Sequence, residues 1–151
     1  MIDRQKRDHL AHRLRLLAAG QLTNDEFEDS INFISDDSAI WHIYRDGAWT
    51  LYSDLSEYKL IGRHKLTNEV KRNVARVILF LKSDREFEWH DPTWYTKAAM
   101  FLLGLLTCNV VPRWYYKTIW GKQGNFQVWP YIRKTDFEAD LGTEIGDSDR
   151  L

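Results

Sequence analysis

The chain has few of the residues that stabilise small exported proteins or separate domains. It contains one cysteine, Cys108, among 151 residues, so no internal disulfide can form and we expect a reducing compartment. Eight glycines and three prolines provide no linker that would divide the chain. Its first ten residues, MIDRQKRDHL, carry charges where an export signal needs an apolar run. We therefore expect one domain in the cytoplasm.

Sequence motifs of the common enzyme classes are also missing. There is no G-x-G-x-x-G, P-loop, G-x-S-x-G or H-E-x-x-H pattern. The net charge of −1 produces no overall attraction to nucleic acid or to an anionic membrane. These absences do not exclude catalysis, but they favour a protein that is not an enzyme and needs no cofactor or metal.

Apolar residues recur with a helical period over most of the chain. The pattern predicts a mainly α-helical single domain at residues 1–141, a bundle of about five to six helices with a small two-stranded β element near the C-terminus. A flexible, acidic tail is expected at 142–151. The predicted helices cover 2–19, 23–34, 38–55, 67–81, 91–108 and a short segment from 135. Thr23 is expected to begin its helix in a capping box with Glu26, and Thr67 to cap the fourth helix. The predicted core consists of Leu14, Leu17, Phe27, Ile31, Trp41, Leu51, Val74, Ile78, Leu81, Leu102 and Leu105.

Acidic residues and a histidine crowd together in ILFLKSDREFEWHDP, residues 78–92. Carboxylates and imidazoles are the groups that move protons or bind metals. Their spacing here matches no known catalytic or metal-binding pattern, so we favour a structural role. An enzyme stays an alternative, with a site around Glu86, Glu88, His90 and Asp91.

Two structural interpretations compete for the same stretch. KSDREFE and KTDFEAD share the S/T-x-x-E pattern of a capping box, in which Ser83 or Thr135 would begin a helix. Alternatively, EFEW (86–89) and FQVW (126–129) would pair as short strands, with aromatic residues on one face. The aromatic alternation favours the strand pair at 86–89. Asp91 and Pro92 are typical of the start of the next helix.

The charges are unevenly distributed. From Pro92 through Lys134 there is no Asp or Glu, whereas six Lys and Arg residues occur among many Trp and Tyr residues. This segment is either the most buried part of the domain, a membrane-interface segment, or a stacking surface for single-stranded nucleic acid. No RNA-binding motif supports the last, so we do not expect a nucleic-acid partner.

The favoured hypothesis is a non-enzymatic interaction protein with an unidentified protein partner. The alternative is a protein peripheral to the inner membrane, lodging residues 94–117 at an anionic bilayer surface. The apolar run 98–111 reaches ~21 Å as a helix, short of the ~30 Å bilayer core, so spanning is not expected. Self-association stays open. The predicted partner-binding residues are Arg113, Trp114, Tyr115, Lys117, Trp120 and Lys122.

Four segments of the chain resemble a family of small uncharacterised bacterial proteins of proteobacterial type. They are GQLTNDEFED, AWTLYSDLSEYKLIG, ILFLKSDREFEW and VWPYIRKTDFEA, which are spread over most of the chain. The resemblance implies a bacterial cytoplasmic protein. Because the family has no assigned activity, it transfers no functional residue to this sequence.

Overall fold

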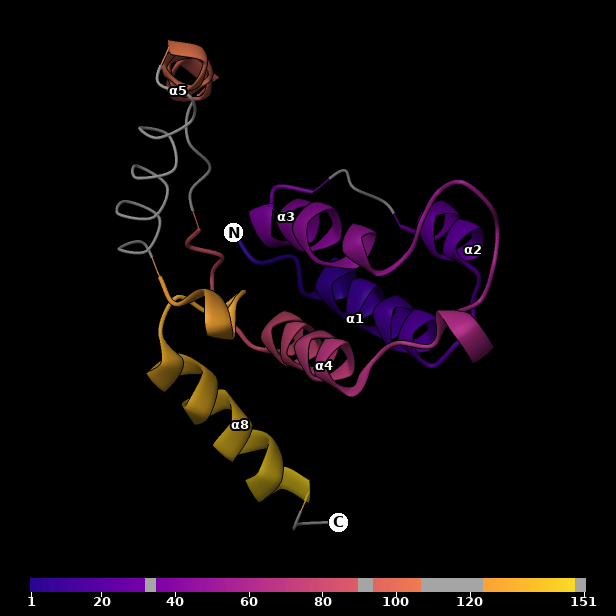
Figure 1. Ribbon diagram of the computed structural model, residues 1–151. Coiled ribbons are helices and arrows are strands. Elements are labelled where there is room, and N and C mark those ends of the chain that lie inside the picture. Colours follow the sequence, from indigo (N-terminus) through magenta and orange to yellow (C-terminus); the bar gives the residue numbers. More distant parts are fainter. Residues whose placement is uncertain (32–34, 90–93, 107–123, 149–151) are drawn as a thin grey trace.

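The computed structural model describes residues 1–31, 35–89, 94–106 and 124–148, and these residues are mainly helical, as predicted (Figure 1). Their six α-helices are α1 (Arg4–Ala18), α2 (Asn24–Asp29), α3 (Ser38–Asp46), α4 (Asn68–Lys82), α5 (Trp94–Leu106) and α8 (Lys134–Ser148). Short 3-10 helices lie at Ala48–Leu51, Gly62–His64 and Phe126–Val128.

Capping side chains set the starts of four of these helices. The predicted capping box at Thr23 is confirmed, since the Thr23 hydroxyl accepts from the Glu26 N–H and the Glu26 carboxylate from the Thr23 N–H. The hydroxyl of Thr67 likewise accepts from the Val70 N–H, 3.3 Å away. Two further caps were not predicted: Asp3 begins α1 and Asp37 begins α3.

Gly47 interrupts the helix that was predicted to continue to residue 55. A Cβ at this position would lie 2.7 Å from the carbonyl oxygen of Ile43 and 3.0 Å from the ring of Trp129. The absence of a side chain therefore lets Trp129 approach the end of α3, and a 3-10 turn follows. The inward face of α3 carries Ile40 and Ile43, whereas Trp41, a predicted core residue, is 46% exposed.

The core lies around α1, which packs along α4 and is covered by α2 and α3 (Figure 1). Six predicted core residues are buried: Leu14, Leu17, Phe27, Ile31, Val74 and Leu81. Leu51 and Ile78 are partly buried against the same cluster. Leu102 and Leu105, which were also predicted to be internal, are exposed on α5. Helical periodicity identified an apolar helix there but could not show whether another element packs against it.

The predicted strand pair is not formed. Residues 126–128 form a 3-10 helix and residues 86–89 have no regular structure, so the described residues contain no strand. The two segments do lie together. The ring centroids of Trp89 and Phe126 are 4.8 Å apart, and the Trp89 indole N–H donates to the carbonyl oxygen of Pro130 at 2.9 Å. Aromatic contacts, not a β ladder, join them.

The helix starts predicted at Ser83 and Thr135 have different outcomes. Ser83 ends α4 instead of beginning a helix, because its N–H donates to the carbonyl oxygens of Leu79 and Phe80. Near Thr135 a helix does form, but it begins one residue earlier, at Lys134, and includes residues 142–148 of the expected tail.

We expect Leu81→Ala to lower the free energy of unfolding by about 2–5 kcal/mol, because Leu81 is fully buried and the substitution leaves a cavity. Urea denaturation followed by circular dichroism measures this change. The matched control is Leu55→Ala, since Leu55 is 95% exposed and its truncation should cost less than about 0.5 kcal/mol. A loss below about 1 kcal/mol at Leu81 would contradict its place in the core.

Candidate functional site

The residues predicted to bind a partner lie outside the part of the chain that the structure describes. This applies to Arg113, Trp114, Tyr115, Lys117, Trp120 and Lys122, and equally to His90, Asp91 and Cys108. The described residues that bear on function are therefore Glu86, Glu88, helix α5 and the surfaces around the core.

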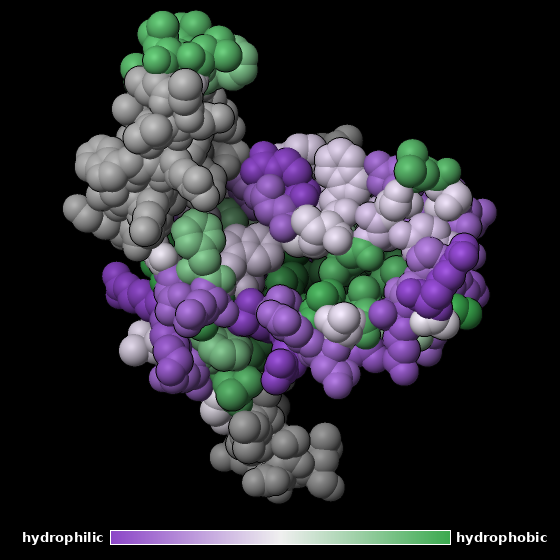
Figure 2. All heavy atoms as spheres, in the orientation of Figure 1, coloured by the Kyte–Doolittle hydropathy of each residue, from purple (hydrophilic) through white to green (hydrophobic). Residues whose placement is uncertain are grey.

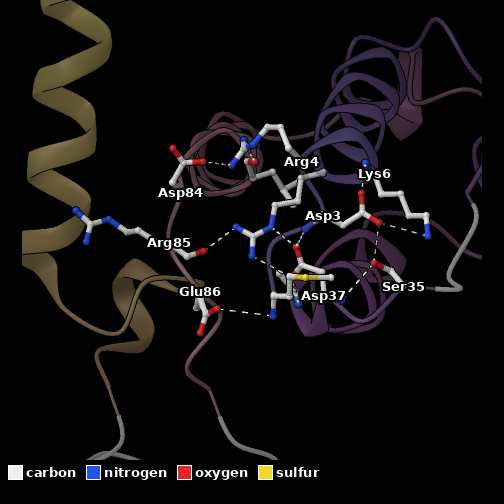
Figure 3. A network of polar contacts seen from close by, with 12 residues as sticks. Asp3, Arg4, Lys6, Ser35, Asp37, Asp84, Arg85 and Glu86 are labelled. Atoms are coloured by element: carbon white, nitrogen blue, oxygen red, sulfur yellow. Dashed lines mark hydrogen bonds and ion pairs between the residues drawn. The ribbon is translucent and has the colours of Figure 1, made fainter.

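Glu86 and Glu88 are the two described members of the predicted acidic cluster. Both are exposed, and the Glu86 carboxylate lies 3.7 Å from the amino group of Met1 (Figure 3). In the described ranges no three His, Cys, Asp or Glu side chains gather as metal ligands would. These residues give the enzyme alternative no support.

The aromatic residues between these acids have a packing role. The ring of Phe87 stacks on His42 with a centroid distance of 4.8 Å and meets Phe80 edge-on at 6.2 Å. Arg85 holds the same segment to α8 through two 2.9 Å hydrogen bonds to the Asp140 carboxylate. Residues 85–89 thus join α4 to α8 as a structural connection.

The most buried charges in the described structure belong to Arg7 and Asp37. The Arg7 guanidinium donates to both carboxylate oxygens of Asp37, from Nε to Oδ2 and from Nη2 to Oδ1 at 2.9 Å. Its Nη1 donates to the carbonyl oxygen of Arg85 at 2.7 Å, and the guanidinium lies 5.5 Å from the ring centroid of Phe80. The paired geometry of this contact is that of a strong, charge-assisted hydrogen bond.

The surroundings of Asp37 stabilise its charged form. Burial alone would raise the pKa of this carboxyl group, but hydrogen bonds from Arg7 and from the Asp3 and Ala39 N–H groups, with the Arg7 charge, lower it below the usual value. Because every described partner belongs to the protein and the pair is closed to solvent, we assign it a structural role.

Helix α5 presents an apolar surface that the rest of the described protein does not cover. Phe101, Leu102, Leu105 and Leu106 are between 59% and 81% exposed. The helix stands away from α1–α4, and its apolar atoms form the uppermost patch in Figure 2. With the exposed Ala98 and Ala99, these side chains span about 160° of the helix at ~100° per residue. That is wider than the ~100° stripe of an ordinary surface helix.

Helix α5 is also too short to cross a bilayer. Its 13 residues extend ~20 Å, and among the described residues no helix combines the length and the apolar character that a membrane span needs. There is no acidic residue in α5, and its one charged residue is Lys97.

A hollow lies on the helical body, between the end of α3 with its 3-10 turn and helix α4 (Figure 2). Its volume is about 280 Å³. Its lining is mainly apolar and includes Leu14, Val77 and Trp129. The charged residues among those that line it are Asp46 and Arg76.

The sequence interpretation missed the residues of the Arg7–Asp37 pair and the hollow at Arg76. Asp3 and Asp37 precede helices by one residue, which is a local N-cap signature that could have been found. The partnership of Arg7 with Asp37 joins residues 30 positions apart, and no local pattern indicates it. The same holds for Arg76, whose hollow is formed by four separate segments of the chain.

Comparison of the chain with protein-family models, with curated proteins and with solved structures finds no match.

We expect Asp37→Asn to lower the free energy of unfolding by about 3–5 kcal/mol at pH 7, because the neutral amide leaves the buried Arg7 guanidinium without its counter-charge. Urea denaturation provides the measurement. Asp8→Asn is the matched control: Asp8 pairs with Lys82 at 2.9 Å on the surface, so its loss should cost at most about 1 kcal/mol.

The difference in unfolding free energy between wild type and Asp37→Asn should depend on pH. A carboxyl group whose pKa is lowered by folding stabilises the folded state above its unfolded pKa of ~3.9. That contribution is lost as the pH falls through the lower, folded pKa. The difference between wild type and Asp37→Asn should therefore narrow below about pH 4, and a difference that stays constant to pH 2 would contradict the assignment.

Proposed function

We propose that the protein is a non-enzymatic, membrane-peripheral protein whose α5 segment lodges in the interface of an anionic bilayer. The observation that carries the proposal is the exposed apolar surface of α5, with Phe101, Leu102, Leu105 and Leu106 in solvent. Fully burying one such side chain contributes about 1.5–3 kcal/mol, so four of them provide a substantial driving force for leaving water.

Three features favour a bilayer over a groove on a partner protein. A groove usually takes one narrow face of a helix, whereas the exposed apolar arc of α5 is broad. The acid-free segment from Pro92 to Lys134 also contains six basic residues, of which Lys134 pairs with Glu138 at the start of α8. Anionic headgroups attract a basic residue near the surface by about 1 kcal/mol. Trp and Tyr residues at both ends of the apolar run are typical of segments at a membrane interface.

A protein partner is the second candidate. It rests on the same acid-free composition, with Arg113, Trp114, Tyr115, Lys117, Trp120 and Lys122 as the contact surface. The cytoplasmic setting at the inner membrane and the relation to a bacterial protein family remain predictions from the sequence.

Co-sedimentation with vesicles tests the membrane proposal. Wild-type protein should pellet with vesicles that contain an anionic phospholipid at low salt, and less so as salt screens the headgroup charge. The double variant Leu102→Glu with Leu105→Glu should reduce partitioning at least about tenfold, because it puts two carboxylates into the apolar interface.

Leu55→Glu is the control, since Leu55 is also exposed to solvent, at 95%, but belongs to the helical body. It should partition as the wild type does. Failure of the wild type to bind anionic vesicles at low salt would reject the membrane proposal. Undiminished binding of the α5 double variant would instead show that another surface is responsible.

A further inference from the structure

The hollow between α3 and α4 has the composition of a small ligand site. Leu14, Ala48, Val74 and Val77, which line it, are buried core residues, so this part of the lining is apolar. The volume of about 280 Å³ lies just below the ~300–1,000 Å³ typical of ligand pockets. At ~30 Å³ per water-sized atom it holds roughly nine or ten non-hydrogen atoms.

The polar group that matters in this hollow is the guanidinium of Arg76. Its Nε donates to the carbonyl oxygen of Trp129 at 2.7 Å, and one Nη2 hydrogen bond goes to Asn73 Oδ1 at 3.1 Å. These bonds hold the side chain in place and use two of the five N–H donors of an arginine, leaving three. No carboxylate of the described protein pairs with it.

The half-buried position of Arg76 is electrostatically unfavourable without an anion. Burial lowers the pKa of its guanidinium, with no neighbouring carboxylate to oppose the effect. This differs from Arg7, whose burial is matched by Asp37. A bound anion would provide Arg76 with the counter-charge that Asp37 provides for Arg7.

The other charged residue that lines the hollow, Asp46, already has a counter-charge within the protein. Arg45 donates to both of its carboxylate oxygens, at 2.7 and 2.8 Å, and His42 Nδ1 lies 3.5 Å away. Asp46 is therefore a weaker obstacle to an anion than an isolated carboxylate would be. Asn73 and Thr50 are the neutral polar side chains that complete the lining.

We propose that this hollow binds a small amphipathic carboxylate, with its carboxylate on Arg76 and its apolar body against Leu14, Val74 and Trp129. A guanidinium with three further N–H donors suits a carboxylate, which accepts two hydrogen bonds at once. The site lies on the helical body, apart from α5, and does not depend on membrane binding.

Amide chemical-shift titration of the full chain tests this site with octanoate, 1-octanol and 3-phenylpropionate as probes. Octanoate has about ten non-hydrogen atoms, which the hollow accommodates. Its shifts should concentrate at Val70, Asn73 and Val74, and it should bind wild type about tenfold more tightly than octanol does. A comparison of octanoate with 3-phenylpropionate distinguishes an alkyl from an aromatic ligand body.

Arg76→Gln should weaken octanoate binding about tenfold and remove its advantage over octanol, because the amide keeps hydrogen-bonding capacity but not the charge. Arg72→Gln is the matched control, an exposed arginine on the same helix that does not line the hollow. It should bind octanoate within about twofold of wild type.

Three results would overturn the proposal: equal binding of octanoate and octanol to wild type, undiminished octanoate binding by Arg76→Gln, or octanoate shifts confined to α5. If Arg76→Gln does not fold, the wild-type comparison between octanoate and octanol decides the matter alone. Because Leu102→Glu with Leu105→Glu leaves the hollow intact, that variant should still bind octanoate even if it has lost vesicle binding.

Discussion

The guanidinium of Arg7 and the carboxylate of Asp37 meet in the interior, where a lone charge would cost several kcal/mol. Each partner also bonds to other parts of the chain. Asp37 accepts the Asp3 N–H before α1 and the Ala39 N–H at the start of α3, while Arg7 donates to the carbonyl oxygen of Arg85 beyond α4. Such a pair adds little net stability compared with apolar packing. Its consequence is that α1, α3 and the end of α4 can satisfy these charges in one relative position only.

This constraint determines the path of the chain after α4. The Arg85 carbonyl oxygen accepts a hydrogen bond from Arg7, whereas the Arg85 side chain donates to Asp140 on α8. Figure 3 shows the Arg85 side chain extending toward α8. Phe87 is then directed onto the core and Trp89 onto the residues before α8. Residues 85–89, whose acidic residues were considered as an alternative active site, thus connect α4 to α8. Their exposed glutamates are the residues that this connection leaves in solvent.

The sequence predicts those features of the fold that depend on neighbouring residues. Thr23 and Thr67 cap helices as expected, because a cap needs only a hydroxyl and an N–H group three residues away. The contact of Gly47 with the ring of Trp129 could not be predicted, because Trp129 lies 82 positions further along the chain. Helix α5 shows a second limit. Apolar composition predicted burial for Leu102 and Leu105, but burial requires a covering surface that a local pattern does not contain. For the same reason the hollow at Arg76 had no sequence signature.

The distribution of charge gives the proposed membrane contact a direction. Six of the 21 Lys and Arg residues and none of the 22 Asp and Glu residues lie between Pro92 and Lys134, so that segment carries +6. The remaining 15 basic and 22 acidic residues give the rest of the chain −7. An anionic bilayer would therefore attract residues 92–134, which contain α5, and repel the rest of the chain. Because the repulsion falls off over a Debye length of ~8 Å at physiological salt, it acts on a body lying flat against the surface and not on one held away from it. The projection of α5 away from α1–α4 is the geometry that satisfies both forces, since it allows apolar contact while the acidic body stays in water.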